Sequence, residues 1–139
     1  MRRRLFATLM LAAGMLFAAP AAALADGITM NGTPTAGSIT VDEGTNTITV
    51  SGNATMSGNG DAFTINANTT LEFDPGATLT LTGYTNAFVV SNATLSGGGW
   101  NITDGDGMDL FRLKTGGKLS IDDDVTLAGN GTDAATDTA

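Results

Sequence analysis

The chain has 139 residues, a formal net charge of −8, no cysteine and no histidine. Without cysteine it can form neither disulfides nor thiolate zinc sites, and without histidine it lacks the commonest general base of enzymes. The negative charge argues against nucleic acid and anionic membrane surfaces as partners, because both are recognised through cationic patches.

Residues 1–25 have the organisation of a secretory signal peptide. The basic start Arg2–Arg4 precedes an apolar run from Leu5 to Ala19, and Ala23-Leu24-Ala25 supplies a small-x-small cleavage site. The apolar run is short and no stop-transfer charges follow it, so we expect no transmembrane segment after cleavage. Cleavage would leave three cationic side chains against 14 carboxylates, a net charge of −11. The sequence therefore predicts an exported protein, secreted or held at the surface of the cell envelope.

Residues 26–38 contain one short apolar-polar-apolar segment, Ile28-Thr29-Met30, before a turn-rich run. We expect this segment to form a partial coil or cap, because the first coil of a repeat array exposes unpaired backbone groups. At the other end, residues 136–139 are small and polar and are expected to fray.

Residues 39–135 repeat a unit of 21–26 residues that holds three apolar-polar-apolar triplets and ends in a turn rich in Gly, Asp and Asn. The first triplets begin at Ile39, Phe63, Phe88 and Phe111, the second at Ile48, Leu71, Ala93 and Leu119, and the third at Ala54, Leu79, Trp100 and Val125. A fixed period with three strands per unit is typical of solenoids.

The triplets predict an all-β fold, a right-handed single-stranded parallel β-helix of about four coils. Alternate side chains of a strand point to opposite faces, so the outer residues of each triplet would face a shared core and the middle one solvent. Phe63, Phe88 and Phe111 would then stack inside. An antiparallel sandwich of short strands is the alternative, but it explains the alternation and not the three registers that repeat together.

The repeat resembles the right-handed parallel β-helix, or pectin-lyase-like, superfamily, and in particular the arrays of bacterial adhesins and autotransporter passenger domains. The resemblance covers about residues 39–135 and includes Gly117-Lys118-Leu119-Ser120-Ile121 and the segment from Val125 to Gly131. It implies an architecture more than a function, because such arrays serve adhesins, lyases and inert stalks. Adhesins of this type carry more coils and an anchor.

The segment from Asp104 to Asp109 is the densest set of oxygen ligands. Asp104, Asp106 and Asp109 alternate with small residues and could converge on Ca²⁺, the one cofactor that the sequence suggests. Met108 breaks the spacing of an EF-hand loop, and Asp and Gly also serve turns for backbone reasons alone.

Two polar rows are expected on the outside of the stack. The ligand-facing row carries Thr55, Thr80, Asn101 and Thr126, and a second row carries Thr49, Glu72, Thr94 and Ser120. Stacked hydroxyls could bind glycans or, on a flat and regular surface, ice; the same residues also suit any solvent-facing strand.

These features favour a non-catalytic module with an adhesin-like or structural role, either on its own or as a fragment of a longer array. The expected partners are surface glycans or a host or cell-surface protein. A polysaccharide lyase or hydrolase of the same fold is the alternative, with Arg112 and Lys114 beside the acidic turn; an ice- or glycan-binding solenoid is another. Leu113, Ile121 and Leu127 would form an apolar edge on the last coil. We therefore expect self-association through the C-terminal coil.

Overall fold

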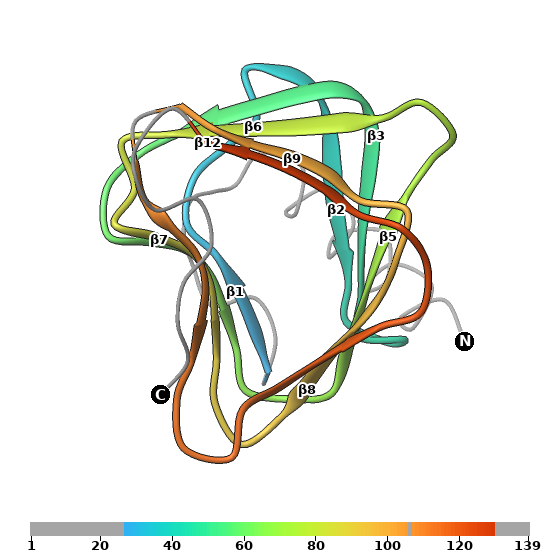
Figure 1. Cartoon of the computed structure of the whole chain (residues 1–139), viewed down its shortest axis with the longest axis vertical. Helices are drawn as coiled ribbons and strands as arrows, with labels where there is room; N and C mark the ends of the chain where they lie inside the picture. The colour runs from blue at the N-terminus through green and yellow to red at the C-terminus, as the bar shows by residue number, and fades with distance from the viewer. Residues whose placement is uncertain (1–26, 106, 130–139) are drawn as a thin grey trace, which may run out of the picture.

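The protein is a parallel β-solenoid of about three turns. The computed structural model describes residues 27–105 and 107–129, and every regular element in these ranges is a strand. Viewed along the stack, the successive coils superimpose around one interior (Figure 1). No helix long and apolar enough to cross a membrane occurs within the described ranges.

Three walls enclose the interior. The first wall contains β4 (Asp61–Ile65), β7 (Asn86–Val90) and β10 (Asp109–Leu113). The second contains β5 (Thr69–Phe73), β8 (Thr94–Gly97) and β11 (Lys118–Ile121). The third contains β6 (Thr78–Thr82), β9 (Asn101–Asp104) and β12 (Thr126–Gly129). The long strand β3 (Thr47–Ser57) starts both the second and the third wall, pairing in parallel with β5 and with β6. It crosses the corner at Gly52, whose φ of 68° is easily adopted only by glycine.

The first wall confirms the predicted aromatic stack. Phe63 pairs with Phe88 and Phe88 with Phe111 in a parallel register. The Phe63 and Phe88 ring centroids lie 4.9 Å apart, and those of Phe88 and Phe111 lie 5.6 Å apart, both pairs stacked. The strand spacing of about 4.8 Å makes this contact possible, because it matches the distance at which parallel rings meet.

The N-terminal end differs from the prediction. Ile39-Thr40-Val41, expected to open the first coil, lies in β2 (Ala36–Asp42), which pairs antiparallel with β3. The first wall begins instead with β1 (Ile28–Met30), antiparallel to β4. The parallel stack therefore starts at residue 47, and both antiparallel strands close its N-terminal end. Alternation of apolar and polar residues does not predict whether a strand pairs parallel or antiparallel, because the pattern is the same in either strand direction.

The register of the second and third walls also differs. Leu71 pairs with Gly97 rather than with Ala93, and Leu79 pairs with Ile102 rather than with Trp100. The shifts are of four and two residues, so inward and outward faces are kept while the neighbours change. Trp100 lies outside the strands and packs in the interior, where it is 1% exposed. Its indole N–H donates to the carbonyl of Leu71 at 2.8 Å.

Candidate functional site

The predicted acidic turn is arranged around its own backbone. Asp104 ends β9 fully buried, and its Oδ1 accepts the N–H of Gly107 at 2.7 Å. Asp109 begins β10, where its Oδ2 lies 3.9 Å from an Arg112 guanidinium nitrogen. Across residues 27–105 and 107–129 no three acidic side chains converge as a metal site would require. Asp106 lies outside the described residues, so the calcium site stays a prediction.

The predicted ligand-facing row consists of two adjacent rows on the third wall. Thr55 pairs with Thr80, and Thr80 pairs with Thr103 instead of Asn101. Asn101 pairs with Thr126 in the neighbouring row. In the earlier coils, the same row contains Asn53 paired with Thr78. The structure thus brings all four predicted residues to one wall, and the two-residue register shift places them in two columns.

The third wall presents a nearly continuous surface of hydroxyl and amide groups. Thr55, Thr80 and Thr103 are half-buried among their neighbours, whereas Asn53 and Asn101 are exposed. The Thr78 hydroxyl donates to the side-chain oxygen of Asn53 at 3.0 Å, which links two successive coils. Between these residues, Ala54, Leu79 and Ile102 point inward and are fully buried. The rigid interior therefore fixes the spacing of the polar groups outside.

The second wall carries a row that the sequence misassigned. Thr47 pairs with Thr70, Thr70 with Ser96, and Ser96 with Ser120, giving one hydroxyl on each of four successive strands. The predicted row of Thr49, Glu72, Thr94 and Ser120 is divided: Thr49 pairs with Glu72, whereas Thr94 pairs with Lys118.

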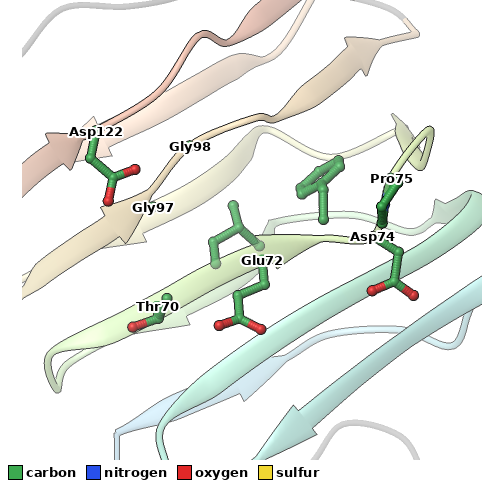
Figure 2. A pocket seen from close by; sticks show the side chains of 9 residues that line it. Thr70, Glu72, Asp74, Pro75, Gly97, Gly98 and Asp122 are labelled. Carbon is green, nitrogen blue, oxygen red and sulfur yellow. The ribbon is translucent and has the colours of Figure 1, made fainter.

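An acidic groove opens beside this row, with a volume of about 350 Å³. Glu72 and Asp74 project from the end of β5 on one side, and Asp122 lies across from them beyond Gly97 and Gly98 (Figure 2). Asp74 Oδ2 accepts the Ser51 hydroxyl at 2.6 Å.

The glycine run Gly97-Gly98-Gly99 creates the groove. β5 continues to Phe73, but its neighbour β8 ends at Gly97, opposite Leu71. An added Cβ at Gly97 would lie 2.3 Å from the Leu71 carbonyl oxygen, so the backbone approaches too closely for any side chain. The chain then turns inward to Trp100 and leaves Glu72 and Phe73 without a strand above them. In the sequence, this groove is signalled by the glycine run next to Trp100, which predicts a turn but not the space beside it.

Asp122-Asp123-Asp124 forms the exposed corner above the groove. The Asp122 N–H donates to the carbonyl of Gly97 at 2.9 Å, and the Asp124 N–H donates to Oδ1 of Asp123 at 2.8 Å. All three carboxylates face solvent. The corner therefore adds negative charge to the rim of the groove.

No family model, no curated protein and no solved structure matches this chain. The fold and the groups displayed on its walls are thus the basis for a functional proposal.

Proposed function

We propose that this chain is an exported, non-catalytic β-helix module that attaches to surface carbohydrate, an adhesin-like role. The observation that carries the proposal is the pair of polar columns on the third wall. One column consists of Thr55, Thr80 and Thr103 in register. The column beside it contains the pairs Asn53 with Thr78 and Asn101 with Thr126. The leader-like residues 1–25 support export.

Such a surface suits a polymer with repeating hydroxyl groups. A threonine hydroxyl and an asparagine amide can each donate and accept hydrogen bonds. Within each column, successive side chains repeat at about 4.8 Å, the spacing between paired strands. Because the side chains are short and stand on a fully packed interior, little conformational entropy would be lost when a glycan binds.

Glycan binding can be tested with a carbohydrate array and the double variant Thr55→Val/Thr80→Val. Valine keeps the shape and removes two hydroxyls, each worth about 0.5–1.5 kcal/mol as a hydrogen-bond partner, so affinity for the selected glycan should fall about tenfold or more. Thr64→Val, on the first wall, is the matched control and should bind as the parent does. Failure of every glycan to bind, or unchanged affinity of the double variant, would refute the proposal.

A second candidate function is polysaccharide cleavage, which the acidic groove favours. Glu72, Asp74 and Asp122 line one concave surface, and carboxylate pairs carry out acid–base chemistry in most glycoside hydrolases. Incubation with a panel of polysaccharides, followed by assay of new chain ends, tests this function. Glu72→Gln should abolish cleavage if the groove is catalytic, whereas Thr55→Val/Thr80→Val should retain it.

A further inference from the structure

The C-terminal end of the solenoid leaves apolar side chains incompletely covered on two walls. Leu119 and Leu127 are half-buried and Ile121 is 44% exposed. One coil earlier, Leu95 and Ile102, the in-register neighbours of Leu119 and Leu127, are 0% exposed. A further layer placed on this end would therefore bury apolar surface that the chain already buries everywhere below it.

Among the described strands, the outermost one of each wall has one free edge, at either end of the stack. Within the described ranges, β10, β11 and β12 each pair with one neighbour, as do β1 and β2 at the opposite end. Such edges offer unpaired N–H and C=O groups to another strand. The two ends are thus chemically able to pair with each other across two copies of the chain.

The two ends of the stack carry opposite charges at the corner between the first and second walls. This corner is formed by four stacked turns. The turns contain residues 43–46, 66–69, 91–93 and 114–117, and hydrogen bonds from Thr70 N to Asn46 O, from Thr94 N to Asn68 Oδ1 and from Asn92 N to Thr115 O connect the successive layers.

The charges of this corner change sign along the stack. Asp42 and Glu43 lie at its N-terminal end, Lys114 and Lys118 at its C-terminal end, and the two turns between them carry no charge. Neither lysine forms an ion pair with another described residue. In a copy that continued the stack, the two ammonium groups would meet the two carboxylates one layer away.

We propose that this protein assembles head to tail, with the C-terminal end of one copy seated on the N-terminal cap of a second. β11 of one copy would pair with the outer edge of β2 in the next, bringing Lys114 and Lys118 beside Asp42 and Glu43. The two surfaces are different and lie at opposite ends of the stack, so each added copy extends the same axis and the product is a linear assembly. The polar columns of the third wall would continue from copy to copy.

The opposite arrangement, two C-terminal ends face to face, is electrostatically worse. It would bring Asp122, Asp123 and Asp124 of both copies into one interface, where like charges repel. Head-to-tail stacking places the same carboxylates over Ser38, Ile39 and Thr40 of β2, which are uncharged.

Sedimentation velocity tests the proposal with two variants in which the charges of one end are reversed. The sample is the full-length gene product, purified from its native host in its naturally processed form. Variant one is Lys114→Glu/Lys118→Glu. Variant two is Asp42→Asn/Glu43→Lys, in which asparagine keeps the oxygen that accepts the Gly44 N–H. Each variant alone should have an apparent Kd about tenfold or more above the parent's, and an equimolar mixture should recover association. Association of the parent should weaken as salt is raised from about 0.05 to 0.5 M.

Glu72→Lys, in a middle coil, is the matched charge reversal and should associate as the parent does. Circular dichroism of each variant confirms that it folds before association is compared. A parent that stays monomeric at high concentration would overturn the proposal. So would a second variant that associates normally, because the N-terminal cap would then not be the partner surface, or a mixture that fails to recover association.

Discussion

At the scale of single residues, Phe88 tests the core most directly, because its ring stacks on Phe63 on one side and on Phe111 on the other. Phe88→Ala should lower the free energy of unfolding by about 3–5 kcal/mol, since truncation leaves a cavity between two rings. Urea denaturation measures the change. Thr80→Val, on the outside, should change stability by no more than about 0.5 kcal/mol. Similar losses in both variants would contradict the assignment of inside and outside.

Tyr84 connects the first coil to the N-terminal cap. The residue is 4% exposed, its hydroxyl donates to the Asn31 carbonyl at 2.6 Å, and burial raises its pKa above 10.0. A raised pKa means that the folded state favours the neutral phenol. This contribution to stability is complete below about pH 10 and is lost as pH rises through the raised pKa.

Tyr84→Phe should therefore cost about 0.5–1.5 kcal/mol at pH 8, the value of one hydrogen bond. Above about pH 10 the difference between parent and variant should shrink, because only the parent has a phenol to ionise. Urea denaturation at both pH values provides the comparison. A difference that stays constant with pH would show that Tyr84 titrates as freely in the folded state as in the unfolded one.

At the scale of elements, the sequence predicted the faces of the strands better than their partners. Phe63, Phe88 and Phe111 were placed correctly because a bulky side chain recurring once per coil fixes one register. The predicted partners of Leu71 and Leu79 in β3, Ile48 and Ala54, are confirmed. Their predicted partners in the next coil are wrong, since a shift by an even number of residues keeps every side chain on its face. Ile39 was placed in a coil although the Asp42–Asn46 turn, with Asn46 at φ 52°, makes a hairpin.

The candidate sites were predictable only in part, for the same reason. Thr55, Thr80, Asn101 and Thr126 could be assigned to one outer wall from alternation, but their order in columns depends on the register. The glycine run before Trp100 indicates a turn but not the groove, because the groove results from the early end of β8 beside the longer β5. The end of β8 is set by the packing of Trp100 and by the close contact between the Gly97 backbone and the Leu71 carbonyl. Both depend on the tertiary structure.

The close approach at Gly97 also provides a test of the second wall. Gly97→Ala would place a methyl group against the Leu71 carbonyl, at a φ of 136°, and displace the indole that bonds to the same carbonyl. We expect a loss of about 2 kcal/mol or more in unfolding free energy. Trp100 is the one tryptophan in the chain, so its fluorescence should also shift to the red.

Gly76→Ala is the matched control, because Gly76 has a φ of 79° but no atom within 4 Å of an added Cβ. Its cost should be the backbone strain alone, about 1–2 kcal/mol, with unchanged fluorescence. If Gly97→Ala left the fluorescence as it is in the parent, Trp100 would not depend on the glycine for its position.

At the scale of the whole molecule, stability should vary along the stack. The central strands β5, β6 and β7 have a neighbour on each side, whereas β11 and β12 pair with one neighbour among the described strands and carry half-buried apolar residues. In a solenoid each coil is stabilised mainly by the adjacent coils, so the end coil opens most readily. Hydrogen exchange at low protein concentration should therefore be fastest in β11 and β12 and slowest in β5–β7.

The concentration dependence of that gradient separates the properties of one molecule from those of an assembly. If copies stack end to end, β11 of one copy gains the edge of β2 from another, so exchange in both strands should slow together as concentration rises. Exchange in β6 should stay constant, because its amides already have partners on both sides. Lys114→Glu/Lys118→Glu should remove the concentration dependence and leave the low-concentration gradient unchanged. Slowing confined to β11, without β2, would point to contact between two C-terminal ends.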